Sequence, residues 1–268
     1  MLPRDLVLVR HGQSEGNLAN RKSEGGDHTA FDETFRARHS SSWRLTDLGK
    51  KQAYRAGHWL EQAFGKNGFD RYMTSEYARA METAAMLRLP NAEWFLDPYL
   101  IERDWGELEA LPQDERQERF GNALLRRQDE PFFWRPPNGE RFVELCLRVD
   151  RVLHTLHREC SDMRVLIVCH GEVMRAFQVR LERMSQARFR QVTISPEDTD
   201  RIHNCQIIHY TRTNPETNKL QKHAGWTRWI RPADDPPTTA GWQQIVRPRY
   251  TNNDLRSIVD EIQPTVTT

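Results

Sequence analysis

The chain has 268 residues, with 39 lysines and arginines against 38 aspartates and glutamates, a formal net charge of +1. This length can bury one substantial core, and nothing in the composition requires two large domains. The balanced charge predicts no general attraction to nucleic acid or membrane, and no apolar stretch suggests a transmembrane helix. We expect a single domain over residues 1–268, with a core over about residues 5–212 and a C-terminal extension over about residues 213–268.

Strands and helices are predicted to alternate from the N-terminus. The apolar run Leu6 to Val9 is typical of a buried strand. Residues 20–44 have few apolar side chains and are too long for an idle loop, so they either rim a pocket or form a mobile surface loop. Thr46 or Asp47 can cap the helix that follows. Its apolar side chains recur at helical spacing: Ala53, Ala56, Leu60, Ala63 and Phe64.

The alternation continues through the middle of the chain. A strand over residues 69–74 leads to a helix that carries Arg79, with Ser75 as its N-cap and Pro90 as its end. A long helix is predicted to start at Asn138, with Phe142, Cys146, Val149, Leu153 and Leu156 on one face. Between these two helices we expect a short strand over residues 93–96 and a polar helix over residues 112–128, and a strand over residues 165–168 after them. The pattern predicts an α/β fold with three α/β/α layers around a mostly parallel central sheet.

The C-terminal part is less regular. Residues 206–211 are predicted to form an edge strand, which the turn at 214–218 and the run 226–230 complete as a hairpin. Residues 232–248 are proline-rich and expected to be irregular, and residues 253–262 can form a last helix. Trp226, Trp229 and Trp242 could form a stacking surface for nucleic acid, but we favour a packed hairpin that covers the core.

Two apolar strands end in the same way, and this pairing is the strongest functional signal. Leu6–Val9 runs into Arg10-His11-Gly12, and 165–168 runs into Cys169-His170-Gly171. In open α/β sheets, ligands bind beyond the carboxyl ends of the strands, where both histidines would lie. If one phosphoryl group touches both rings, the rings must lie within about 8 Å of each other.

The residues around these strand ends resemble a known family. The octapeptide from Arg10 to Asn17 resembles the signature of the histidine phosphatase superfamily, in its phosphoglycerate-mutase-like branch (branch 1). The segment 75–84 resembles the part of that family that carries a second phosphate-binding arginine, here Arg79. Segment 102–106 resembles the part with the acidic proton donor, here Glu102, and segments 45–53 and 137–140 match two further landmarks. The resemblance covers about residues 5–212 and implies a phosphoglycerate-mutase-like fold.

The resemblance also implies roles for these side chains. His11 is the nucleophile that forms a phosphohistidine, Glu102 is the general acid and then base, and His170 binds the phosphoryl oxygens. Arg10, Asn17 and Arg79 bind the phosphate together with Gly171, at the start of a helix. Glu102 needs a raised pKa to act as an acid. Two arginines and two histidines already supply the positive field, so we expect no metal and no cofactor.

Three alternatives to a histidine phosphatase remain open at this stage. A phosphoglycerate-type mutase shares the same core, but Gly16 stands where mutases usually carry tryptophan, and residues 108–113 lack their downstream lysine. Arg126-Arg127 is similar to a mutase arginine pair, but the long insertion that follows it in mutases is missing. A cysteine phosphatase could use Cys169 and Arg175, which have Cys-x5-Arg spacing. A non-catalytic phosphate-binding scaffold would have lost the nucleophile or the acid. We favour the phosphatase.

The remaining reactive side chains indicate no further chemistry. The four cysteines lack metal-binding spacing, and the simple interpretation is free thiols in a reducing compartment. His154 and His157 have no carboxylate or thiolate cluster near them, so we expect a solvated helix face rather than a metal site. The first predicted strand leaves no room for a signal peptide, and we expect a cytoplasmic enzyme that acts on a phosphorylated small molecule. The sequence does not determine the oligomeric state.

Overall fold

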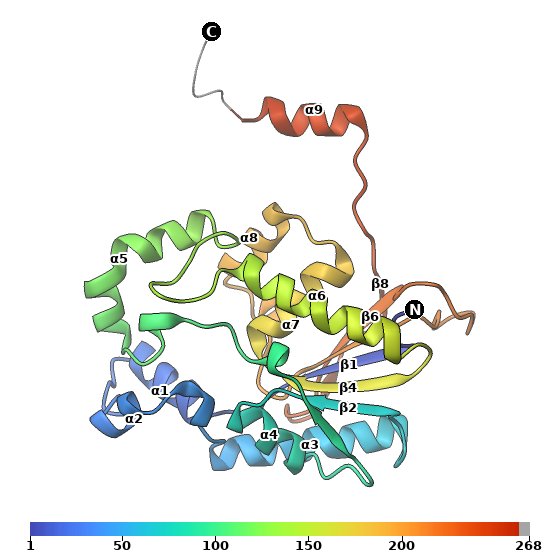
Figure 1. Cartoon of the computed structure of the whole chain (residues 1–268), viewed down its shortest axis with the longest axis horizontal. Helices are drawn as coiled ribbons and strands as arrows, with labels where there is room; N and C mark the ends of the chain where they lie inside the picture. The colour runs from blue at the N-terminus through green and yellow to red at the C-terminus, as the bar shows by residue number, and fades with distance from the viewer. Residues whose placement is uncertain (263–268) are drawn as a thin grey trace.

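The computed structural model describes residues 1–262 and has a mixed sheet at its centre (Figure 1). Its parallel part consists of β1 (Asp5–Arg10), β2 (Arg71–Thr74), β3 (Trp94–Leu96) and β4 (Arg164–Cys169). The antiparallel part consists of β5 (Ile207–Thr211), β6 (Trp226–Arg231), β7 (Thr238–Thr239) and β8 (Gln243–Gln244). The strand order is β3-β2-β4-β1-β5-β6-β7, and β8 also pairs with β6.

Helices cover both faces of this sheet, which gives the three layers (Figure 1). Side chains alternate along β1, so that Val7 and Val9 pack with α3 (Asp47–Phe64) and α4 (Ala78–Met86). Leu6 and Leu8 pack on the other face with α6 (Phe142–Glu159) and α7 (Gly171–Glu182). The parallel strands are therefore buried on both sides, as their near-continuous apolar runs predict. The expected α/β class and layered architecture are confirmed.

Most of the remaining helices lie around one end of the sheet, and the last one stands apart from it (Figure 1). They are α1 (Glu15–Glu24), α2 (Glu33–Ala37), α5 (Gln113–Asp129, with a kink at Phe120), α8 (Gln186–Ile194) and α9 (Asn252–Asp260). Short 3-10 helices lie at Ser40–Ser42, Pro98–Leu100, Gly106–Leu108 and Asp198–Asp200.

Residues 20–44 contain short helices joined by turns rather than one continuous loop. They contain the end of α1, the whole of α2 and the 3-10 helix Ser40–Ser42. Phe31, Phe35 and Trp43 form a small separate core with Ala19, and the rings of Phe35 and Trp43 stack with centroids 4.6 Å apart. Three aromatic side chains therefore hold together a segment whose average composition is polar.

Several predicted boundaries are wrong. Ser75 does not cap the Arg79 helix: α4 begins at Ala78 with Tyr77 as N-cap, and Ser75 Oγ instead accepts a hydrogen bond from the Tyr77 amide (3.3 Å). That helix ends at Met86, before Pro90. In each case residues that the cap and breaker signals assigned to the helix lie outside it, in bends and turns.

Two further predictions are wrong, one because of a local turn and one because of strand pairing. Asn138 does not start the long helix, because its φ of 57° belongs to a tight turn, and α6 begins at Phe142. The strand over residues 206–211 is not at an edge: β5 lies between β1 and β6, and all five of its residues are buried. The interior position of β5 results from its pairing with β6, which follows later in the chain.

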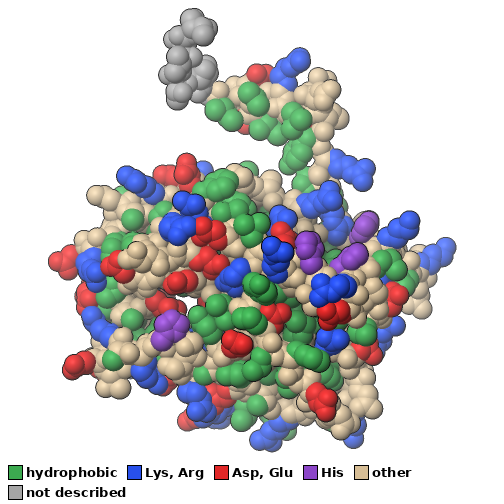
Figure 2. Space-filling model, viewed as in Figure 1, with side chains coloured by type: hydrophobic (Ala, Val, Ile, Leu, Met, Phe, Trp, Pro, Cys, Tyr) green, Lys and Arg blue, Asp and Glu red, His purple; other side chains and the backbone are tan. Residues whose placement is uncertain are grey.

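The C-terminal segment packs as a hairpin and then leaves the body. Trp226 is buried on β6, and the Arg228 guanidinium lies over the Trp242 ring at 4.4 Å, which supports the packed hairpin over a stacking surface. The side chains of α9 are exposed, and the helix stands apart from the rest of the chain (Figures 1 and 2). Within residues 1–262, no helix is both long and apolar enough to cross a membrane.

Candidate active site

The two motif histidines follow directly from neighbouring strands. Arg10 at the end of β1 pairs with Cys169 at the end of β4, so His11 and His170 emerge side by side at the carboxyl edge of the sheet. Their ring centroids are 5.1 Å apart with an interplanar angle of 62°. Both side chains are buried. This separation is within the distance that a shared phosphoryl group requires.

The hydrogen bonds of His11 fix its tautomer. Nδ1 lies 2.7 Å from the Gly12 carbonyl oxygen, which can only accept, so Nδ1 carries the proton. Nε2 then keeps its lone pair and accepts from Arg79 Nε at 3.3 Å. Burial, followed by the charges of Arg79 and Arg10, holds the pKa of His11 well below its usual range. The ring is therefore neutral with Nε2 unprotonated, as a nucleophile requires.

Arg79, Arg10 and Asn17 surround His11 with hydrogen-bond donors. Arg79 lies in the first turn of α4 and donates from Nη1 to the Ser40 carbonyl oxygen (2.7 Å). Arg10 donates to the Ile202 carbonyl oxygen, and its buried Nε has no partner among residues 1–262. The side-chain Oδ1 of Asn17 accepts from the backbone N–H of Ser14 (3.2 Å) and from Asn204 Nδ2 (2.9 Å), which leaves the side-chain NH₂ of Asn17 to donate elsewhere. All three residues line the same cavity.

The glycines after the two strands allow close packing of the backbone against neighbouring groups. A Cβ at Gly12 would lie 2.4 Å from the Gly49 carbonyl oxygen, so only glycine fits there. A Cβ at Gly171 would lie 3.4 Å from Arg10 Nε, against the guanidinium. Gly171 is also the first residue of α7, whose N-terminus faces the cavity that it lines.

His170 is more deeply buried than His11, at 0% against 2% exposed. Its Nε2 is 2.8 Å from Ser75 Oγ, its Nδ1 has no partner among the described residues, and it is 0% exposed. It does not line the cavity, unlike the other residues expected to bind phosphate. Burial, then Arg79 and His11, keeps the pKa of His170 well below its usual range. His170 is therefore a neutral ring in contact with His11.

Glu102 is the only one of the expected site residues with an acidic side chain, and it lines the same cavity as His11. Burial, with the charge of Glu172 second, raises its pKa to about 7. Arg79 and Arg10 oppose this shift. One carboxylate oxygen accepts the Arg103 amide hydrogen at 2.9 Å. A carboxyl group with a pKa near neutrality can both give and take a proton at physiological pH.

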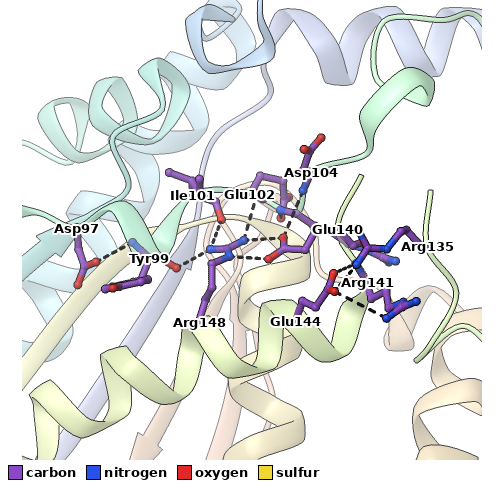
Figure 3. Close-up of polar contacts among 11 residues, drawn as sticks. Asp97, Tyr99, Ile101, Glu102, Asp104, Arg135, Glu140, Arg141, Glu144 and Arg148 are labelled. Carbon is purple, nitrogen blue, oxygen red and sulfur yellow. Dashed lines mark hydrogen bonds and ion pairs between the residues drawn. The ribbon is translucent and has the colours of Figure 1, made fainter. Parts of the chain in front are cut away.

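Arg148 of α6 holds the backbone around Glu102 as a clamp, which no sequence motif predicts (Figure 3). The Arg148 guanidinium donates to the carbonyl oxygens of Tyr99 (2.7 Å), Ile101 (3.2 Å) and Glu102 (3.4 Å). Glu140 accepts two hydrogen bonds from the same guanidinium, at 2.7 and 2.8 Å. Arg148 lies inside a helix that the spacing of apolar side chains predicts. The neighbouring residues in the sequence do not distinguish it from an arginine that points into solvent.

The cavity extends well beyond the histidines. Its volume is about 750 Å³, within the range of small-molecule sites. Residues of α1, α5 and α8 line it. The segment 20–44 contributes to its rim through four side chains: Asn20, Arg21, Glu24 and Trp43. Lysines and arginines are interspersed with acidic side chains over the face in Figure 2.

The cysteine-phosphatase interpretation finds no support in the geometry. Cys169 is fully buried within the core cluster and does not line the cavity. Burial raises the pKa of its thiol, which disfavours the reactive thiolate. Arg175 does line the cavity, but it donates to Gln178 and to the Asp200 carbonyl oxygen.

No group of three or more His, Cys, Asp or Glu side chains in the described range could hold a metal ion. His154 and His157 lie exposed on α6.

Comparison with known proteins places the chain in a family. The family model of the histidine phosphatase superfamily (branch 1) matches residues 6–222, and the chain belongs to this superfamily. It is 33% identical over 193 residues to 2,3-bisphosphoglycerate-dependent phosphoglycerate mutase of Methylorubrum populi, covering 69% of this chain and 82% of that protein. It is 31% identical over 173 residues to 6-phosphofructo-2-kinase/fructose-2,6-bisphosphatase 3 of Homo sapiens, covering 65% of this chain and 28% of that protein.

A solved structure extends the likeness to the fold. Mycobacterial glucosyl-3-phosphoglycerate phosphatase, in complex with VO3, has a TM-score of 0.60 and 21% identity, covering 77% of this chain and 92% of that one. One of these sequence relatives is thus named as a mutase and the other as a kinase/bisphosphatase, and the structural neighbour is named as a phosphatase. The family is established, and its members carry out phosphoryl transfer, but the names leave the particular reaction open.

Proposed function

We propose that the chain is a phosphatase that hydrolyses small phosphomonoesters through a phosphohistidine on His11. The observation that carries this proposal is the pairing of two groups in one cavity. His11 has an unprotonated Nε2, and Glu102 has a pKa of about 7. Nucleophilic transfer to histidine needs a free lone pair and a proton for the leaving group, and these two side chains supply them.

The reaction has two steps. The Nε2 lone pair of His11 attacks phosphorus, the ester P–O bond breaks, and protonated Glu102 gives its proton to the departing alkoxide oxygen. Water then attacks the phosphohistidine, Glu102 takes a proton from that water, and the P–N bond breaks to release phosphate and neutral His11. Glu102 is again protonated at the end of the cycle, so the catalyst is restored.

The arginines stabilise charge on the transferring group. Arg79 already contacts His11 Nε2, and Arg10 has an unpartnered Nε among the described residues, so both have donors available for phosphoryl oxygens. Asn17 and the N-terminus of α7 at Gly171 add neutral donors. His170, whose ring centroid lies 5.1 Å from that of His11 and whose Nδ1 has no partner among the described residues, is proposed to contact a further phosphoryl oxygen. We propose that this set of cations works without a metal or cofactor.

A phosphoglycerate-type mutase is the second candidate, because the relative from Methylorubrum populi carries that name. Against it, Trp43 lies where a large side chain at position 16 would go: a Cβ at Gly16 would approach the Trp43 ring to 2.3 Å. One assay separates the two reactions. With 3-phosphoglycerate and a catalytic amount of 2,3-bisphosphoglycerate, a phosphatase releases inorganic phosphate, whereas a mutase accumulates 2-phosphoglycerate.

The phosphohistidine itself is tested by trapping. Enzyme quenched during turnover of a ³²P-labelled phosphomonoester should carry a phosphoryl group that is stable to base and labile to acid, as a phosphoramidate is. The His11→Ala variant should carry none and lose activity by several orders of magnitude. An active His11→Ala enzyme, or an adduct stable to acid, would remove the proposal.

A further inference from the structure

Helix α9 (Asn252–Asp260) exposes an apolar face to solvent (Figure 2). Four apolar side chains recur at helical spacing and so share one side of the helix: Leu255, Ile258, Val259 and Ile262. Each of them is between 47% and 67% exposed. An isolated helix of nine residues is marginal in water. Burial of this face against another surface would therefore stabilise α9.

Acidic side chains border the apolar face of α9. Asp254 and Glu261 stand four residues before and three residues after Ile258, so they lie beside it on the helix. Over residues 252–262, the acidic side chains outnumber the single basic one, Arg256. Helices that bind lipid surfaces carry lysines and arginines on their polar face, so this charge disfavours an anionic membrane. A surface complementary to α9 combines apolar side chains with cations.

The outer side of α3 and the end of α4 form such a surface, which we call the α3–α4 groove. It has a volume of about 410 Å³ and an apolar lining of Tyr54 and Met86. Within residues 1–262, its other lining residues are all basic: Lys50, Lys51, Arg55 and Arg88. Lys50 pairs with Asp47 at 3.3 Å, and the other three cations have no acidic partner within 4.0 Å among the described residues. The Tyr54 ring is 55% exposed.

The α3–α4 groove and α9 lie on opposite sides of the sheet (Figure 1). Shortly before α9, Arg247 donates to the carbonyl oxygens of Ala224 (2.7 Å) and of Leu181 (3.0 Å) in α7. The four residues between Arg247 and α9 span at most about 14 Å. Between Arg247 and the groove lie the sheet and α3, which alone is about 10–12 Å in diameter. The helix therefore does not reach along the groove of its own chain.

We propose that the α3–α4 groove binds α9 of a second copy of the chain, in a two-fold dimer that exchanges this helix reciprocally. The apolar face of α9 lies against Tyr54 and Met86, and its acidic edge faces the basic rim. In such a dimer each copy gives one helix and receives one, so the same contact forms twice. None of the groove residues lines the cavity in front of His11, so the inference is independent of the proposed function.

The first test measures the oligomeric state of the full chain by sedimentation velocity from about 1 to about 100 µM. The wild-type chain should be a dimer within this range. Ile258→Asp should raise the dissociation constant of the dimer by about a hundredfold or more, because it places a charge in both apolar contacts. Ser257→Asp is the matched control: it adds the same charge on the polar face of α9 and should change the constant by less than about twofold.

The second test addresses the groove. Lys51→Glu/Tyr54→Asp changes two exposed side chains of α3 and should weaken the dimer by about as much as Ile258→Asp. Because the contact pairs acidic with basic side chains, the wild-type dimer should also weaken between about 50 mM and about 500 mM NaCl. Circular dichroism and thermal unfolding of each variant should match the wild type, which shows that the variants fold.

Three outcomes would overturn the proposal. A wild-type chain that stays monomeric at about 100 µM would show that α9 has another partner or packs on its own chain. A dimer that survives Ile258→Asp would place the interface elsewhere. A dimer that Ile258→Asp abolishes but Lys51→Glu/Tyr54→Asp leaves intact would show that two α9 helices pack against each other and not in the groove.

Discussion

The pKa of Glu102 makes a quantitative prediction about the pH dependence of the reaction. Burial and the charge of Glu172 raise it to about 7, and Glu102 must be protonated to donate a proton to the leaving group. With that pKa, about nine-tenths of the enzyme is active at pH 6 and about one-tenth at pH 8. For an alkyl phosphate, kcat/KM should therefore fall about tenfold between these values. His11 does not limit this range, because its pKa lies well below the usual value and the ring stays neutral.

The Glu102→Gln variant provides the control for this profile. Its amide cannot donate the proton, so kcat/KM for an alkyl phosphate should drop by about 10²- to 10⁴-fold, the usual contribution of a general acid. The loss should be much smaller for p-nitrophenyl phosphate, whose phenolate leaves with little need of a proton. Substrate phosphate also titrates, near pH 6, and the variant profile records that contribution alone.

The assay is therefore the ratio of the two profiles, measured from pH 5 to pH 9 under subsaturating alkyl phosphate. Division by the Glu102→Gln profile should leave a single titration with its midpoint near pH 7. A ratio that stays flat across this range, or a variant that keeps the tenfold fall, would show that another group donates the proton.

Four further outcomes follow from the structure. Cys169→Ser should leave activity within about twofold, since the thiol is buried away from the cavity; a dead enzyme would return the cysteine mechanism to consideration. Arg148→Gln should lower kcat for alkyl phosphates more than for p-nitrophenyl phosphate, because it frees the backbone that holds Glu102, and equal losses would argue against positioning. Gly16→Ala should destabilise the fold by about 1–3 kcal/mol in denaturant unfolding, because its Cβ would meet Trp43 at 2.3 Å; an unchanged midpoint would contradict this. Enzyme treated with a chelator should keep its activity, and restoration only by a divalent ion would refute metal independence.

Local pattern was sufficient for the elements that position the histidines. The apolar runs before His11 and His170 are continuous because both strands are buried on both faces, so the strands can be recognised in the sequence. The cap at Thr46 likewise depends only on a side chain and an amide three residues away. The motif around Arg10 and His11 could be recognised for the same reason, since its residues are adjacent in sequence.

Tertiary structure decided what depends on partners distant in the chain. The long helix starts at Phe142 rather than Asn138, because Asn138 lies in a tight turn that hydrogen-bonds to the segment around Asp104. Strand β5 is interior, because it pairs with β6, which follows later in the chain. The pKa of Glu102 arises from burial and from Glu172, and the clamp by Arg148 joins residues that lie 46 positions apart. The sequence by itself determined which groups stand at the two strand ends. Only the folded chain decided their protonation and the size of the cavity before them, because desolvation and the approach of charges exist only after distant segments have packed.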